Sequence, residues 1–188
     1  MKRLYVGLLL LGAIILLPKK TQAQWKEHEI KGGWVYHFAR YVTWPEDVFK
    51  KNVIVLGILG DDPFRGVLDE LVANRKAGGR TIEIRRGNTI RELKGSHILF
   101  VGRSEEYRMN ETLGEILKYR SYGVLTIGDG IEGFCEKGGI INFNRERPTF
   151  NINMQAATEA GLYFDPKLWK MAEQIIPNNP NPPKGPGK

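Results

Sequence analysis

The stretch VIVLGIL, residues 53–59, decides the fold class of this 188-residue chain. A continuous apolar run rich in branched residues predicts a strand that is buried on both faces, as in a parallel sheet. Gly60–Pro63 (GDDP) follows, where Asp62 is a good N-cap and the proline a good first helical residue. Apolar side chains then recur at helical spacing over residues 64–72. We therefore predict a strand followed by an amphipathic helix.

The same alternation continues along the chain. His97–Val101 (HILFV) and Val124–Ile127 (VLTI) predict two more buried strands, and Thr81–Arg86 (TIEIRR) alternates like a strand nearer an edge. Ser104 is expected to cap the intervening helix. The buried side of that helix is predicted to carry Leu113, Ile116 and Leu117. Strands and helices in alternation imply a parallel sheet with right-handed crossovers.

The C-terminal part departs from this alternation. Gly139–Asn144 and Pro148–Ile152 are joined by a short link that fits an antiparallel hairpin. Asn153 is predicted to cap a helix, and Asp165 to cap a second one that ends at Pro177. The second helix is expected to point Leu168, Trp169, Ala172 and Ile175 inward. The predicted fold is a three-layer α/β/α sandwich: a mostly parallel sheet with a C-terminal antiparallel hairpin, about six strands and five helices.

An aromatic stretch, Trp34–Pro45 (WVYHFARYVTWP), precedes the first strand. Helical spacing predicts a core face made of Ile30, Trp34, Phe38 and Val42. The rings predicted to be available to a protein partner are Tyr36, His37, Tyr41 and Trp44. Tyr41 borders the core face and fits either role, and Trp44 is expected to end the helix because a proline follows it. Gly32-Gly33 weakens the helix and predicts close packing against a neighbour.

The N-terminus has the layout of a secretory signal peptide. A short basic start precedes the apolar run Leu4–Leu17, and Thr21-Gln22-Ala23 is a plausible cleavage site. The alternative is an uncleaved anchor. We expect a signal peptide over residues 1–23, one α/β domain over 24–176 and a disordered Pro/Gly-rich tail over 177–188.

Charge and cysteine content exclude several functions. The chain has 28 basic and 21 acidic residues, and the leader holds four of the basic ones, which leaves 24 − 21 = +3. These charges are mixed along the chain, so nucleic acid is not an expected partner. Cys135 is the only cysteine, so an internal disulfide is excluded, and we expect the thiol to be buried. The three histidines lack metal-ligand spacing, and no nucleophile elbow or phosphate-binding loop is present.

Ligands of open parallel sheets bind beyond the carboxyl ends of the strands. Three loops, at residues 60–62, 102–104 and 128–130, meet that rule. They offer a candidate ligand site made of Asp61, Asp62, Arg103, Ser104 and Asp129. Ordinary turns explain the same residues more simply. A metal-dependent enzyme that uses the three aspartates is the weakest reading, so we expect no enzyme activity, cofactor or metal.

Six motifs in order resemble the YfiR family of exported bacterial proteins, from Ile30 to Ala172. They are FARYVTWP (38–45), VLGILGDDPF (55–64), LKGSHILFVGRSE (93–105), VLTIGDG (124–130), FCEKGGIINF (134–143) and the segment from Phe150 to Leu162. The resemblance implies a periplasmic protein that binds the periplasmic sensor domain of a membrane diguanylate cyclase and represses it. It also implies a homodimer.

This chain departs from the family in two places. The family suggests redox control through disulfides, which the lone Cys135 cannot provide within one chain, and Gly32-Gly33 stands where alanine is common. We predict a non-enzymatic periplasmic regulator that contacts a cyclase, a histidine kinase or another membrane receptor through its aromatic helix and the loop after it. No direct membrane insertion is expected after cleavage. The alternative is a periplasmic binding protein for a small ligand, held by the three loops.

Overall fold

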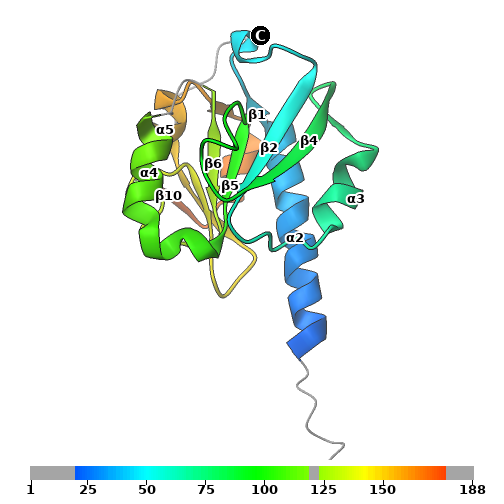
Figure 1. The fold of residues 1–188 in the computed structure, drawn as a ribbon, viewed down its shortest axis with the longest axis vertical. Helices are drawn as coiled ribbons and strands as arrows, with labels where there is room; N and C mark the ends of the chain where they lie inside the picture. The colour runs from blue at the N-terminus through cyan, green and yellow to red at the C-terminus, as the bar shows by residue number, and fades with distance from the viewer. Residues whose placement is uncertain (1–19, 119–122, 177–188) are drawn as a thin grey trace, which may run out of the picture.

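The computed structural model describes residues 20–118 and 123–176 and has an α/β fold (Figure 1). Most of the predicted leader and the whole predicted tail, residues 1–19 and 177–188, lie outside the described residues. The main sheet has the strand order β10-β8-β7-β6-β5-β2-β4-β3. Its strands are β2 (Val53–Leu59), β3 (Lys76–Ala77), β4 (Arg80–Gly87), β5 (Ile98–Val101), β6 (Leu125–Gly128), β7 (Ile141–Phe143), β8 (Phe150–Asn153) and β10 (Gln174–Ile176).

All six predicted strands are present, as β2, β4, β5, β6, β7 and β8. β2 lies between β4 and β5 and is parallel to both, with Leu56 paired to Ile84 on one side and to Ile98 on the other. β7 and β8 form the expected antiparallel hairpin. The predicted α/β fold with a mostly parallel sheet is confirmed.

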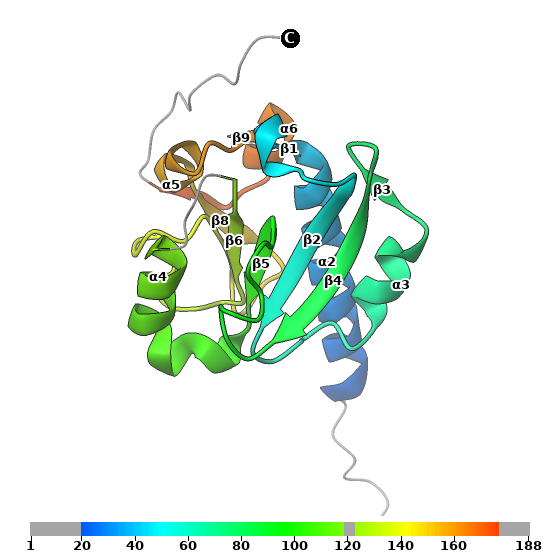
Figure 2. The same ribbon diagram turned by 45° about the horizontal axis from the view of Figure 1, so that its top comes forward.

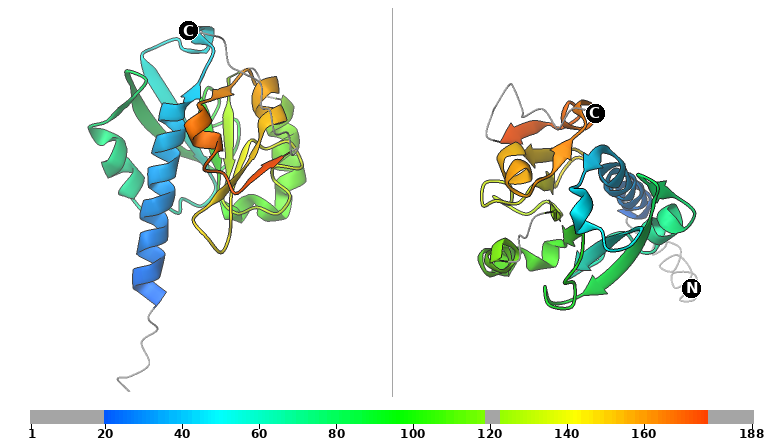
Figure 3. Two further views of the ribbon diagram at one scale, coloured as in Figure 1. Left: turned by 180° about the vertical axis from the view of Figure 1, so that it is seen from behind. Right: turned by 90° about the horizontal axis from the view of Figure 1, so that it is seen from above.

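Helices cover both faces of this sheet (Figure 3). They are α2 (Lys20–Tyr41), α3 (Val67–Ala73), α4 (Met109–Lys118), α5 (Met154–Glu159) and α6 (Pro166–Trp169). The larger core cluster joins α2, α3, α5 and α6 to one face, where Phe38, Phe100 and Phe143 are fully buried. The smaller cluster packs α4 against the other face, through Leu99 and Val101 of β5. The described part of the chain is therefore the predicted α/β/α sandwich.

The short strands were missed in the sequence. β3 and β10 extend the two edges of the sheet, and β1 (Val42–Thr43) pairs with β9 (Tyr163–Phe164) in a separate two-stranded sheet. The predicted helix after Asp165 was wrong beyond Trp169, because residues 174–176 instead pair in parallel with β8. The backbone amide of Glu173 donates to the carbonyl of Phe150 and begins that pairing. Hydrogen bonding to the edge of β8 therefore decides the structure of residues 174–176, although their apolar spacing is typical of a helix.

The side of α2 that faces the core differs from the predicted side. Ile30 is 41% exposed, whereas Val35 and Ala39 are buried beside Phe38. Tyr36 and Trp44, predicted to be available to a partner, are 8% and 7% exposed and belong to the core cluster. The helix has neighbours on two sides, since α3 packs beside it as well as the sheet, so its buried arc is broader than a single stripe. α2 also ends at Tyr41, before Trp44, because β1 begins there.

Two predicted caps have other roles. The Asp62 carboxylate accepts from the Phe64 amide at 2.7 Å, but α3 begins later, after Gly66 in the left-handed region (φ 89°). Ser104 caps no helix, because its hydroxyl accepts from the Asp61 amide at 2.9 Å. Asn153 and Asp165 do cap α5 and α6 as predicted. Leu117, predicted to be buried, is 39% exposed.

We predict that unfolding free energy falls as pH drops below about 6.5, the ordinary histidine pKa, partly through His97. Burial lowers the pKa of His97, whose Nδ1 accepts from the Val55 amide at 2.9 Å. Below pH 6.5, His97 of the unfolded chain therefore binds a proton, whereas His97 of the folded chain stays neutral until the pH is lower.

Urea titrations of the wild type and His97→Asn between pH 7.5 and 5.5 measure this contribution. The asparagine oxygen can replace the Nδ1 acceptor but does not titrate, so the variant should lose less stability over this range. Equal slopes would contradict the prediction. His28 and His37, whose pKa values burial also lowers, are unchanged in both proteins.

Candidate functional site

The loops at the carboxyl ends of the strands meet as predicted (Figure 2). The Asp61 amide and the Ser104 hydroxyl join the loops after β2 and β5. Arg103 Nε donates to the carbonyl oxygen of Asp129 at 3.2 Å, which joins the loops after β5 and β6. Asp62 turns away and pairs with Arg86 of β4 at 2.7 Å. Four of the five predicted residues therefore contact one another in two pairs, Asp61 with Ser104 and Arg103 with Asp129. Asp62 is not part of either pair.

A buried ion pair fills the part of this edge next to α2. The Lys31 ammonium lies 2.8 Å from Asp129 Oδ1, and the two residues are 2% and 6% exposed. Glu27, one helical turn earlier, lies 2.6 Å from the same ammonium. Lys31 was not predicted from the sequence as part of the site. Its position beside Gly32, on a helix expected to pack closely against a neighbour, could have indicated that it is buried. Asp129 is therefore already paired with a cation from its own chain.

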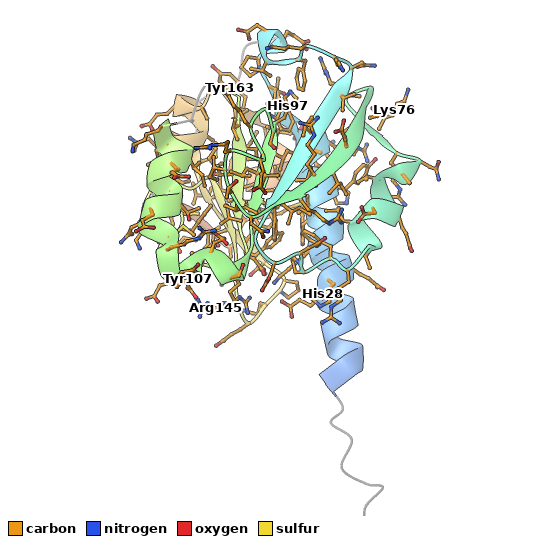
Figure 4. The ribbon with its side chains drawn as sticks, viewed as in Figure 1. His28, Lys76, His97, Tyr107, Arg145 and Tyr163 are labelled. Atoms are coloured by element: carbon orange, nitrogen blue, oxygen red, sulfur yellow. The ribbon has the colours of Figure 1, made fainter. Side chains whose placement is uncertain are left out.

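Two arginines, Arg103 and Arg145, contact the β6 loop, and Arg145 is labelled in Figure 4. Arg145 Nε donates to the carbonyl of Gly130 at 2.7 Å, next to the carbonyl that Arg103 binds. The Arg145 guanidinium also pairs with Glu106. A backbone hydrogen bond from Glu132, together with Arg145, lowers the pKa of Glu106 and keeps it ionised. A side chain at Gly130 (φ 67°) would lie 2.9 Å from Arg145 Cγ, so this loop leaves little room beside its own arginines.

A polar cavity of about 820 Å³ lies at the same edge of the sheet, beyond the predicted residues. Leu59 at the end of β2, the loop 89–92 and the first turns after β5 line it. Glu105 is 4% exposed there, and its Oε2 accepts from Arg108 Nε at 2.8 Å. None of the five predicted ligand residues lines this cavity. The open space thus lies between β2, β4 and α4, and not over β6.

The four predicted partner residues divide into two pairs. Tyr36 and Trp44 are buried, and the Tyr36 hydroxyl donates to the Lys76 carbonyl at 3.2 Å. His37 and Tyr41 remain partly exposed, with their rings stacked at 5.8 Å. Burial, followed by the charges of Arg40 and Arg75, lowers the pKa of His37, so the stacked ring is neutral at neutral pH.

Comparison with known proteins identifies the family. The profile described as YfiR/HmsC-like matches residues 28–173, most of the chain. The chain belongs to the YfiR/HmsC-like family. Membership points to a periplasmic regulatory protein. A search of curated proteins finds no match.

Among the solved structures that match this YfiR/HmsC-like chain in part is a ligand complex of a bacterial protein. It is the ABC domain in complex with L-Trp from Streptococcus pneumonia, with 14% identity and a TM-score of 0.46. The match covers 69% of this chain and 57% of that one, so the chain spans just over half the length of that protein. A likeness of this degree carries no argument about function.

The thiol of this YfiR/HmsC-like protein is buried, as predicted. Cys135 is 1% exposed, and its sulfur lies 3.8 Å from the carbonyl oxygens of Ile140 and Asn151. Burial raises the pKa of Cys135 to about 12. The thiol therefore stays protonated at neutral pH, and only the thiolate is an effective nucleophile.

Two features are absent from the described residues, a metal-binding cluster and a membrane-spanning helix. Residues 20–118 and 123–176 contain no group of three His, Cys, Asp or Glu side chains placed to hold a metal ion. Asp62 and Asp129, two of the three aspartates considered for metal chemistry, are each paired with a cation. Within the same ranges, no helix has the length and apolar character needed to cross a membrane.

We predict that Lys31→Met lowers the unfolding free energy by about 3 kcal/mol, because it leaves the buried Asp129 carboxylate without its main cation. Urea unfolding at pH 7 measures the loss. In the double variant Lys31→Met/Asp129→Leu the loss should be smaller than in Lys31→Met alone. The control Lys51→Met, at an exposed position, should change stability by less than about 0.5 kcal/mol. A Lys31→Met variant as stable as this control would contradict the assignment.

Proposed function

We propose that this protein is a non-enzymatic periplasmic regulator that binds the periplasmic domain of a membrane signalling protein and represses it. The family resemblance implies a diguanylate cyclase as the partner, and a histidine kinase is the alternative class of partner. The observation that carries the proposal is a line of partly exposed apolar and aromatic side chains along α2. We call it the α2 stripe; its members are Ile30, Trp34, His37 and Tyr41.

The α2 stripe follows the outward side of a helix whose opposite side is in the core. Its members recur at three- and four-residue spacing, so they share one helical face. Figure 3 shows α2 on the outside of the domain, uncovered along much of its length. Gly33 lies beside the stripe, and a Cβ placed there would meet nothing within 4 Å. A partner could therefore approach the helix backbone closely at this point.

Contacts with neighbouring side chains hold the rings of the α2 stripe in place. Trp34 packs edge-on against Phe150 at 4.9 Å and contacts His37 at 6.1 Å. The exposed Arg40 lies over the Tyr41 ring at 5.9 Å. Rigid Trp and Tyr side chains with a neighbouring arginine are typical of energetically dominant interface residues. The partner that suits this surface presents apolar side chains together with an acidic group opposite Arg40.

Export and processing belong to the same proposal. Cleavage after Ala23 would leave residues 24–41 of α2 on the mature protein, so the α2 stripe would survive it intact. The mature protein would then comprise the single domain over residues 24–176 and the tail over 177–188. The homodimer implied by the family resemblance remains a prediction, which sedimentation of the mature chain would test.

We expect His37→Ala/Tyr41→Ala to weaken binding to the periplasmic domain of a co-encoded membrane receptor at least tenfold, because two stacked rings leave the surface. Calorimetric titration measures the dissociation constant. The matched control is Tyr107→Ala, which removes an 84% exposed ring from the turn after β5. Unchanged binding by the double variant, with the fold intact by circular dichroism, would reject the α2 stripe as the surface.

The second candidate is a periplasmic binding protein for a small polar ligand. The supporting observation is the 820 Å³ cavity at the carboxyl edge, with the Glu105–Arg108 pair in its wall. Asp61, Arg103 and Ser104 lie at the same edge and would form a second, smaller site. Asp62 and Asp129 fit this role less well because each already has a cation.

A ligand of this second kind should stabilise the protein by about 2.7 kcal/mol at a hundred times its dissociation constant. A thermal-shift screen of periplasmic metabolites measures this, and Arg108→Gln should abolish any shift that arises in the cavity. Arg103→Ala serves as the comparison for the smaller site. A hit that survives both substitutions would place the ligand outside this edge.

A further inference from the structure

A second cavity, of about 330 Å³, lies at the opposite end of the sheet, where the strands begin. Its inner wall is aliphatic. The residues of this wall are Val48, Ile90, Leu93, Leu99, Ile116 and Val124. This volume is within the range of pockets that hold small organic molecules. Neither the family assignment nor the proposed partner surface uses this cavity, which we call the amino-edge cavity.

The polar groups inside the amino-edge cavity already have partners. The hydroxyl of Ser96 donates to the Leu93 carbonyl at 2.7 Å. His97 accepts from the Val55 amide through Nδ1, and its Nε2 lies 3.4 Å from the Val48 carbonyl oxygen. The inner wall therefore offers no unsatisfied donor or acceptor from these side chains. A hydrocarbon body fits it, whereas a polar body would lose its hydrogen bonds to water without replacement.

Two lysines lie at the rim of the amino-edge cavity. Lys50 and Lys94 are exposed, and among the described residues neither forms an ion pair. Asp47 is the one acidic residue of the lining, so the rim carries two positive charges against one negative charge. An anionic head group at the rim would be attracted by this excess. An aliphatic interior with a cationic rim matches a molecule that has an alkyl body and a carboxylate head.

We propose that the amino-edge cavity binds a medium-chain aliphatic carboxylate, with the alkyl chain between Leu93, Ile116 and Val124 and the carboxylate at Lys50 and Lys94. The inference concerns this chain alone and does not depend on the proposed membrane partner. It assigns a ligand site at the amino edge of the sheet, which shares only Ile90 with the polar cavity at the carboxyl edge.

A ligand in this cavity should affect the residues that follow α2. Val48 forms part of the wall, and the next residue, Phe49, stacks on His97 at 4.8 Å. Phe49 also packs edge-on against Trp44 at 6.3 Å, just after α2 ends. The indole Nε1 of Trp44 is buried without a hydrogen-bond partner among the described residues. A ligand that fixes Val48 should therefore reduce local opening of residues 44–50.

Titration calorimetry with octanoate, butanoate and octanol on the mature chain tests the ligand class. Octanoate should bind roughly two hundredfold more tightly than butanoate, since each of four added methylenes contributes about fourfold. Octanol should bind more weakly than octanoate because it lacks the charge. Equal binding of octanol and octanoate, or no octanoate binding at millimolar concentration, would overturn the proposal.

Variants locate the site. Lys94→Glu and Lys50→Glu should each weaken octanoate binding about tenfold at low ionic strength, whereas the matched control Lys51→Glu, next to the rim, should not. Val124→Phe should abolish binding by filling the interior, with thermal unfolding as the check that the partly exposed position tolerates it. Octanoate should also slow hydrogen exchange over residues 44–50. The assigned site would be wrong if the rim variants left the octanoate dissociation constant unchanged. It would also be wrong if octanoate left hydrogen exchange over residues 44–50 unchanged.

Discussion

The position of α2 on the sheet depends on the ion pair between Lys31 and Asp129. Both side chains are buried, so a shift of the helix along its axis would separate them and leave the Asp129 carboxylate with only the longer contact to Arg103, at 3.9 Å. Such a pair adds little net stability over an apolar substitute, but separating it costs several kcal/mol. The pair therefore acts as a constraint on register. Because the α2 stripe is displayed by the same helix, its place on the surface is set by this contact.

The other end of α2 is fixed by backbone pairing. The Asp165 amide donates to the Tyr41 carbonyl at 2.9 Å, and Val42 and Thr43 pair with Phe164 and Tyr163. A charge contact at one end and a strand pair at the other hold the helix along its length. Tyr41 itself thus contributes its carbonyl to the fold and its ring to the surface. The C-terminal segment that follows α5 is consequently part of the support for the α2 stripe.

The sequence could reveal the strands because buried parallel strands are continuous apolar runs, as in residues 53–59 and 97–101. It could not reveal β3 or β10, which have two and three residues and exist only because a neighbouring edge offers hydrogen bonds. The face of α2 was misjudged for a related reason, since α3 and the sheet together bury more of the helix than one periodic stripe. Lys31 and Asp129 are 98 residues apart, so local patterning could not pair them, and the cation that occupies the predicted ligand loop was missed.

The carboxyl edge is the usual ligand site of an open parallel sheet, yet here its centre is occupied by the chain itself. Lys31 neutralises Asp129, and Arg103 and Arg145 bind consecutive carbonyls of the same loop. These contacts satisfy the Asp129 carboxylate and two backbone carbonyls of the loop, and the Lys31–Asp129 pair also ties α2 to β6. Asp129 thus serves here to position a helix, whereas Arg103 and Arg145 join the loops around β6. A helix fixed at both ends presents the rings on its outward side in one arrangement, and a preorganised surface loses less conformational entropy when it binds.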